Sequence, residues 1–249
     1  MPTLREYVRL ADDVYTSWVD SGDAPRGWTV AAGMVRDDSA FWNAGSGIGS
    51  SGLQCRAYVR GRGSEAVIAF KGTKPSMASD LAADAGVVFC VEPQQMKDAV
   101  TLTQSWIPAL QRRQLRVTLT GHSLGGAIAQ HVGARSGTRF VTFNAPGMLA
   151  NTVGLCASPF RAQNLRLGVN YIMLGDAIGN FGRHVGDTVR LNRTGFAKVA
   201  LASVMAVATG LAGAAAAAGA SLSQHGIGNF SAYLDAGDPK FPPDSDPLA

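Results

Sequence analysis

Apolar residues near the start of the chain recur every three or four positions, a spacing typical of an amphipathic helix packed against a domain. The residues on this stripe are Leu4, Tyr7, Val8, Ala11, Val14, Tyr15 and Trp18. Further along, residues 53–60 and 65–70 (E-A-V-I-A-F) have the pattern of strands, and the turn R-G-R-G between them predicts a hairpin. Residues 40–52 are rich in glycine and serine, and we expect them to form a loop.

The rest of the chain alternates between helical and strand-like segments. A helix is predicted near 93–112, a strand and helix flank position 123, and strands are predicted near 139–143, 169–174 and 184–191. This alternation predicts an α/β fold with a mainly parallel central sheet and helices on both faces. We expect a single domain over residues 1–235, followed at 236–249 by a Pro- and Asp-rich tail that is either loose or a surface strap.

Composition narrows the class of protein. A chain of 249 residues, 46% hydrophobic and 16% charged, suits one large domain whose core needs no disulfides. The net charge of +4 favours either anionic membrane surfaces or a merely soluble basic surface; the arginines form no block, and no nucleic-acid partner is expected. The charged first residues argue against a signal peptide, so we expect a soluble or peripheral membrane protein, with a specialised export route left open.

No cofactor or metal is expected. Cys55, Cys90 and Cys156 lie in unlike contexts without C-x-x-C spacing, which argues against a zinc site and against a paired disulfide framework. The glycines at 47, 49 and 52 satisfy G-x-G-x-x-G, but the segment that follows alternates like a strand, whereas a dinucleotide site needs a helix there.

The candidate chemistry centres on residues 117–127, V-T-L-T-G-H-S-L-G-G-A. A strand that ends in a serine flanked by glycines and is followed at once by a helix is the nucleophile elbow of an α/β-hydrolase. Ser123 is the predicted nucleophile, while Gly121 and Gly125 lack the Cβ atoms that would collide where strand and helix meet. The backbone N–H of Leu124, at the start of the helix, is a predicted donor to the oxyanion.

A serine hydroxyl needs a base and an orienting carboxylate to act as a nucleophile. In this fold the chain order is serine, acid, histidine, which selects His225 as the base, with His184 as the competitor. Asp176 follows the strand N-Y-I-M-L and so falls at its carboxyl end, on the edge where Ser123 emerges. Asp176 is therefore favoured as the acid over Asp187, which lies inside a later strand-like run.

Several motifs in the same order resemble those of the class 3 lipases, the family of fungal triacylglycerol lipases and their bacterial and plant relatives. They are V-I-A-F-K-G-T at 67–73, S-D-L-A-A-D at 79–84, T-G-H-S-L-G-G-A at the elbow, F-N-A-P-G at 143–147, L-G-D-A-I-G-N-F-G-R-H-V-G-D-T-V-R-L, and H-G-I-G-N-F-S-A-Y-L. The resemblance spans roughly residues 4–235. It implies an α/β-hydrolase fold with Asp176 as the acid and His184 in a structural role.

The resemblance also implies that Thr73 is a second oxyanion donor, and that Asp80 and Asp84 hold this loop by pairing with Lys71 or nearby amides. The chain departs from the family's pattern at Lys71, where arginine is commoner, and at Ala177 and Gly179, where proline often follows the acid. A further departure is an apolar insert before His225.

The insert, at about 196–222, has no charged residue from Val199 to Leu222. Its length would permit a membrane span. A single straight span would carry the chain far from Ser123, to which His225 must return, so a helix pair broken near 210–213 is favoured. The alternatives are helices packed on the body, a lid over the site, or a hairpin that inserts reversibly into membranes.

These features predict a serine hydrolase that cleaves carboxylic esters of lipids, as a triacylglycerol lipase or phospholipase A1, through a Ser-His-Asp triad and an acyl-enzyme. The predicted partner is a lipid ester at a membrane or lipid–water interface; an inhibitory or immunity protein is left open. One alternative is a bacterial antagonistic phospholipase effector that acts on target-cell membranes. Another is a non-catalytic binding module on a hydrolase fold, and a serine peptidase has no sequence feature in its favour.

Overall fold

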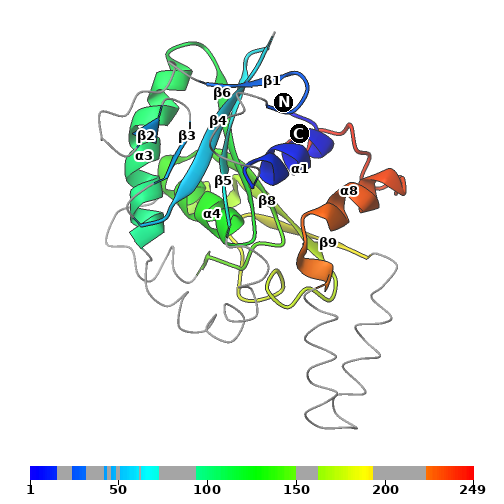
Figure 1. Ribbon diagram of the computed structural model, residues 1–249. Helices are drawn as coiled ribbons and strands as arrows, with labels where there is room; N and C mark the ends of the chain where they lie inside the picture. Colours follow the sequence, from blue (N-terminus) through cyan, green and yellow to red (C-terminus); the bar gives the residue numbers. More distant parts are fainter. Residues whose placement is uncertain are drawn as a thin grey trace.

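The computed structural model describes residues 1–15, 24–31, 42–43, 46–48, 51–61, 63–72, 94–149, 162–192 and 223–249 (Figure 1). Within these ranges the strands are β1 Trp28–Val30, β2 Trp42–Asn43, β3 Ser46–Ile48, β4 Gln54–Arg60, β5 Glu65–Phe70, β6 Arg116–His122, β7 Arg139–Phe143, β8 Gly168–Met173 and β9 Asp187–Leu191. The helices are α1 Leu4–Asp13, α3 Gln94–Gln111, α4 Leu124–Ser136 and α8 Gly228–Asp235, with a short 3₁₀ helix, η2, at Ala162–Arg166.

One sheet joins the described strands in the order β2-β3-β4-β5-β6-β7-β8-β9, with β1 paired to β4 outside this order. The pairs from β5 to β9 are parallel, and the pairs among β1 to β5 are antiparallel. The predicted hairpin is the pair β4 and β5. The prediction of an α/β-hydrolase fold built on a largely parallel sheet is therefore confirmed.

Helices cover both faces of the sheet, as predicted. In Figure 1, α3 and α4 lie over one face, while α1 and α8 lie over the other. Strand β5 shows how one strand serves both layers: Ala66, Ile68 and Phe70 pack in the core under α3 and α4, and Val67 and Ala69 pack in the core under α1 and α8. Because both of its faces are covered, the whole of β5 is buried, which explains its unbroken apolar run.

Helix α1 places the N-terminal stripe on the second face. Thr3 caps it, since the Thr3 hydroxyl accepts from the Glu6 N–H and the Glu6 carboxylate accepts from the Thr3 N–H, a reciprocal capping box. The helix ends at Asp13, before the last positions of the predicted stripe, and Trp18 lies outside the described residues. Tyr15 therefore lies just beyond the end of the helix.

The structure departs from the predicted elements in three places. The predicted loop at 40–52 contains β2 and β3, and β1 was not predicted; each is only two or three residues long, too short for a period-two pattern to be recognised. Helix α8 was not predicted either, because the run H-G-I-G-N-F-S-A-Y-L has glycines at 226 and 228, and glycine disfavours a helix. Strand β9 begins at Asp187, three residues after the predicted start.

The C-terminal segment contacts α1. The N–H groups of Leu4 and Arg5 donate to the carbonyls of Ser245 and Pro243, and Leu248 is buried. Of the two predicted alternatives for this segment, the contacts correspond to a surface strap. The insert at about 196–222 lies outside the described residues, and none of the helices within them is both long and apolar enough to cross a membrane.

Candidate functional site

Ser123 stands at a sharp turn between β6 and α4. Its backbone has φ 58° and ψ −129°, a conformation that costs a non-glycine residue strain and that surrounding packing must hold. A Cβ on Gly121 would lie 2.4 Å from the carbonyl carbon of Gly125, and a Cβ on Gly125 would lie 2.1 Å from the carbonyl oxygen of Phe70. Strand and helix can approach this closely only because both positions are glycine.

The side chains of Ser123, His225 and Asp176 form one continuous hydrogen-bonded series. Ser123 Oγ lies 2.8 Å from His225 Nε2, and His225 Nδ1 lies 3.0 and 3.1 Å from the two carboxylate oxygens of Asp176. A carboxylate only accepts, so Nδ1 carries the proton and Nε2 is left to accept from the serine hydroxyl. All three residues are at most 2% exposed, although 102 and 49 positions separate His225 from its two partners.

Asp176 is held by the turn that follows β8. Its Oδ1 accepts from the N–H of Ile178 at 3.2 Å and its Oδ2 from the N–H of Gly179 at 2.9 Å. A Cβ on Gly179 would lie 2.7 Å from Oδ2 of Asp176. Glycine at this position, one of the chain's departures from the class 3 lipase pattern, therefore lets the backbone close around the carboxylate.

The backbone of His225 is fixed by two polar side chains. Asn144, just past β7 with φ 45°, donates through Nδ2 to the carbonyls of Gln224 and His225 at 2.8 and 2.9 Å, and its Oδ1 accepts from the N–H of Met173 at 2.8 Å. His122 Nε2 lies 2.6 Å from the same His225 carbonyl. The histidine loop is thus attached to the ends of β6, β7 and β8.

The competing residues lie elsewhere. His184 Nε2 donates to the carbonyl of Ala145 at 2.8 Å, and burial lowers the pKa of this imidazole. His131 is buried within α4, and Asp187 is exposed at the start of β9. Of the candidates weighed from the sequence, the structure brings Ser123, Asp176 and His225 together and leaves His184 and Asp187 outside their hydrogen bonds.

The predicted oxyanion donors are only partly described. Leu124 is the first residue of α4, and the first amides of a helix have no acceptor within it, so its N–H is suited to bind an anion. Thr73, Asp80 and Asp84 lie outside the described residues. Lys71, at the edge of this segment, donates from Nζ to Gln54 Oε1 at 2.6 Å.

Sequence reasoning missed Tyr15 and Asn144 as parts of the site. Tyr15 was counted only as a position on the apolar stripe, and Asn144 was quoted only as a letter of F-N-A-P-G. The Tyr15 hydroxyl accepts from the Gly72 N–H at 3.0 Å and lies 3.3 Å from His122 Nδ1. The asparagine in its motif was the one available signal, since a polar residue directly after a buried strand has to find partners.

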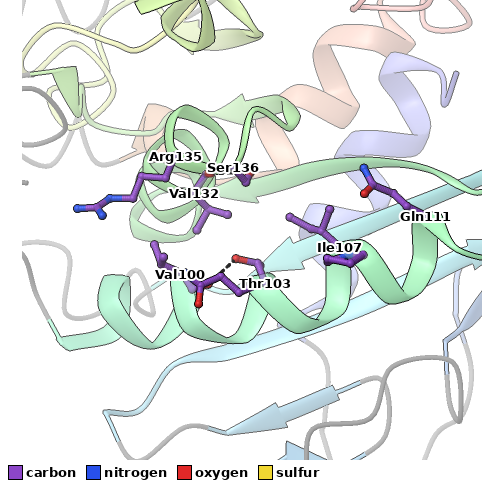
Figure 2. A pocket seen from close by; sticks show the side chains of 9 residues that line it. Val100, Thr103, Ile107, Gln111, Val132, Arg135 and Ser136 are labelled. Carbon is purple, nitrogen blue, oxygen red and sulfur yellow. Dashed lines mark hydrogen bonds between the residues drawn. The ribbon is translucent and has the colours of Figure 1, made fainter. Parts of the chain in front are cut away.

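A separate cavity of about 310 Å³ lies between α3 and α4 (Figure 2). Val100, Ile107 and Val132 supply much of its apolar wall, and Arg135 and Ser136 stand at its rim. Arg135 and Ser136 belong to the last turn of α4, about 18 Å along the helix from Leu124, and Val100 and Ile107 belong to α3. The cavity is therefore remote from Ser123. In the part of the chain that the structure describes, no three His, Cys, Asp or Glu side chains gather as metal ligands.

Comparisons with known proteins identify the family of the chain. A family model described as a phospholipase-like, Tle-like phospholipase domain matches residues 6–228. No curated protein sequence matches the chain. Similar solved structures include the Rhizomucor miehei lipase in a propeptide complex (16% identity, 76% of this chain and 67% of that chain, TM-score 0.48) and Lip2 lipase from Yarrowia lipolytica (15%, 75% and 77%, 0.44). A third is a triacylglycerol lipase from Penicillium expansum (13%, 77% and 79%, 0.48).

Proposed function

The chain belongs to the Tle-like phospholipase domain family, and from that premise we propose that it hydrolyses carboxylic esters of phospholipids with Ser123 as nucleophile, His225 as base and Asp176 as the orienting acid. Membership of the family makes the chain a carboxylic ester hydrolase that acts on lipids. The single observation that carries the residue assignment is the unbroken series of contacts, none longer than 3.1 Å, from Ser123 Oγ through the His225 ring to Asp176.

In the proposed mechanism Ser123 Oγ attacks the ester carbonyl carbon while its proton passes to His225 Nε2. The imidazolium that forms is stabilised by Asp176, and it returns the proton to the alcohol oxygen as the C–O bond breaks. Water, deprotonated by the same imidazole, then attacks the acyl-enzyme and releases the fatty acid. The N–H of Leu124 and, in the segment outside the described residues, Thr73 are the proposed oxyanion donors, each contributing about 3 kcal/mol to lowering the barrier.

The residue assignment is tested with a fluorophosphonate probe and p-nitrophenyl butyrate. We expect one adduct, on Ser123, and turnover that is lost in Ser123→Ala. Ser136→Ala is the matched control, because Ser136 ends the same helix and its hydroxyl donates to the Val132 carbonyl, far from the triad. A probe adduct on another residue, or full turnover by Ser123→Ala, would refute the assignment.

Phospholipid is the proposed substrate in preference to triacylglycerol. The description of the family supports it, and so does the net charge of +4, which favours contact with anionic lipid surfaces. Release of fatty acid should be faster from vesicles that contain phosphatidylglycerol than from emulsified triglyceride, and added salt should reduce the rate on the vesicles. A faster rate on the emulsion would make triacylglycerol the preferred substrate and leave the triad assignment intact.

A further inference from the structure

A series of hydrogen bonds runs behind the triad, from the end of β5 to the backbone of His225. The Gly72 N–H donates to the Tyr15 hydroxyl at 3.0 Å, and that hydroxyl lies 3.3 Å from His122 Nδ1 and 3.3 Å from the His122 carbonyl. His122 Nε2 in turn lies 2.6 Å from the His225 carbonyl. We call Gly72, Tyr15, His122 and His225, in this order, the Tyr15 chain.

The direction of each bond in the Tyr15 chain follows from its partners. A backbone carbonyl only accepts, so the proton of the His122 ring must be on Nε2, facing His225. Burial, followed by the neighbouring His225 ring 4.8 Å away, lowers the pKa of His122 to about 3. The ring is therefore neutral at pH 7 and its Nδ1 is an acceptor. The one Tyr15 O–H proton faces two acceptors of His122 at 3.3 Å, the ring Nδ1 and the backbone carbonyl oxygen.

Gly72 has no room for a side chain. A Cβ at this position would lie 2.6 Å from the Tyr15 hydroxyl and 2.6 Å from the His122 carbonyl oxygen. Burial raises the pKa of the Tyr15 phenol well above its ordinary value, so the hydroxyl keeps the proton that it donates. Gly72, two residues past the end of β5, and His122, the residue before the nucleophile, thus meet at one tyrosine oxygen.

We propose that Tyr15 and His122 are positioning residues, which hold the backbone of Gly72 and the backbone of His225 at a fixed spacing. The proposal rests on the proposed function, since Gly72 directly precedes Thr73, the proposed second oxyanion donor. Oxyanion binding and proton transfer must occur in one geometry, and a displacement of about 1 Å can reduce a rate about 100-fold. The Tyr15 chain connects Gly72, next to the proposed oxyanion donor, with the backbone of His225, the proposed base. The side chains of Tyr15 and His122 make this connection.

Tyr7 offers a matched control on the same N-terminal segment. Its buried hydroxyl donates to Thr118 Oγ1 at 2.9 Å, in the interior of β6 and away from the triad. Tyr7→Phe removes an oxygen with a buried hydrogen bond, and Tyr15→Phe removes an oxygen whose hydrogen bonds are part-buried, so each variant is expected to lose some stability. Only Tyr15→Phe interrupts the chain between Gly72 and His225.

The test compares kcat and KM for p-nitrophenyl butyrate in the two variants, together with their thermal unfolding. We expect Tyr15→Phe to lower kcat about 10- to 100-fold with KM within about twofold, since a positioning loss acts in the transition state. Tyr7→Phe should leave kcat within about twofold of the wild type. Equal kcat values for the two variants in an active protein would overturn the positioning role.

A second variant tests the chain from its other end. His122→Gln can still present an amide donor to the His225 carbonyl, but it places no ring acceptor opposite Tyr15. We expect kcat to fall about 10-fold, and the double variant with Tyr15→Phe to lose much less than the product of the two single effects, because both interrupt one chain. Wild-type kcat in His122→Gln, or fully multiplicative effects, would overturn the proposal.

Failure of the proposed function would give a different result from failure of the positioning role. In that case the wild-type chain would show no turnover that depends on Ser123, and this inference would fall with it. The hydrogen bonds of the Tyr15 chain also have a readout of their own: ¹⁵N chemical shifts of His122 should show an unprotonated Nδ1 and a protonated Nε2 at pH 7. Tyr15→Phe should shift the Nδ1 resonance, and Tyr7→Phe should not; a protonated Nδ1 in the wild type would refute the assigned direction.

Discussion

The two ends of the parallel strands carry polar groups of opposite character. At the carboxyl end, Ser123, Asn144 and Asp176 follow β6, β7 and β8 and are at most 1% exposed. Ser123 and Asn144 form hydrogen bonds with residues of other elements. At the amino end, Arg116 begins β6 with its side chain 59% exposed and pairs with Glu65, at the start of β5, at 2.7 Å. The same sheet thus holds a fully buried polar network at one end. At the other end is an ion pair in which the Arg116 side chain is exposed and the Glu65 carboxylate is mostly covered.

Backbone strain follows the same division. Three non-glycine residues in the described part of the chain have positive φ: Gln114, Ser123 and Asn144. Two of these are at the carboxyl end, and both bond to the loop of His225. Buried polar groups need hydrogen-bond partners, and backbone with positive φ has to be held by its surroundings. The positions of the residues at the carboxyl end are therefore narrowly fixed. At the amino end the Arg116 side chain is exposed to water, so its ion pair with Glu65 is expected to contribute little.

The largest effect that separates the two ends is expected for Asp176→Asn. The amide can still fill the space of the carboxylate, but it does not stabilise the imidazolium and it can favour the wrong tautomer of His225, so kcat should fall about 10⁴-fold. Steady-state kinetics with p-nitrophenyl butyrate measures this. Asp187→Asn, at an exposed carboxylate that starts β9, is the control and should stay within about twofold of the wild type; similar losses in both would remove Asp176 from the mechanism.

The next largest effect concerns packing at the elbow. Gly125→Ala would place a Cβ 2.1 Å from the Phe70 carbonyl oxygen, backbone that cannot move aside locally, so the free energy of unfolding should fall by more than about 3 kcal/mol. Urea unfolding measures it. Gly228→Ala, where nothing lies within 4 Å and the residue begins α8, should change stability by less than about 1 kcal/mol. Equal losses of stability in the two variants would contradict the close contact between residue 125 and the Phe70 carbonyl oxygen.

A third effect is a pH dependence of stability that comes from His122. In the unfolded chain this histidine takes up a proton near its ordinary value of 6.5, whereas the folded chain holds it neutral down to a pKa of about 3, because of burial and then the neighbouring His225. The stabilisation is therefore full above pH 6.5 and is lost as the pH falls from 6.5 toward 3, by about 2 to 3 kcal/mol at pH 4.5. Urea unfolding at pH 7 and 4.5 measures the loss.

The comparison for this prediction is His122→Gln, which cannot titrate in this range. Its stability should fall less than that of the wild type between the two pH values, while the carboxylates common to both chains contribute equally. The same pH dependence in both proteins would mean that His122 is free to take up a proton in the folded state.

The smallest effect is expected at the amino end. Arg116→Gln removes the ion pair between the exposed Arg116 side chain and Glu65, which keeps Arg60 as a partner at 2.9 Å. Stability should fall by less than about 1 kcal/mol, and turnover of p-nitrophenyl butyrate should not change. Thermal unfolding at low and high salt measures this, since any contribution of the pair should shrink when salt is added. A loss of activity in this variant would contradict the division between the two ends.

Much of the fold could be predicted because its signals are local. The apolar run of β5, the alternation before Ser123 and the helical spacing after it each lie within one element, and each was placed within a few residues of its observed bounds. Strands β1 to β3 could not be found, since two or three residues contain no period. Helix α8 is held by Phe230 and Leu234 packing in the core beside α1, a contact between the two ends of the chain that no local window contains.

The sequence by itself determined the residues of the proposed chemistry. They are a serine between two glycines at a strand–helix turn, an aspartate after the next but one strand, and a histidine near the end of the chain. Only the tertiary structure decided the geometry that makes them one group, because His225 lies 102 positions from Ser123 and is held by Asn144 and His122 through its backbone. The tertiary structure also shows that Tyr15, which the sequence pattern placed on an apolar stripe, forms hydrogen bonds with Gly72 and His122. Hydrophobic patterns fix which face of an element is buried, but which polar groups meet at a sheet edge depends on how distant elements pack.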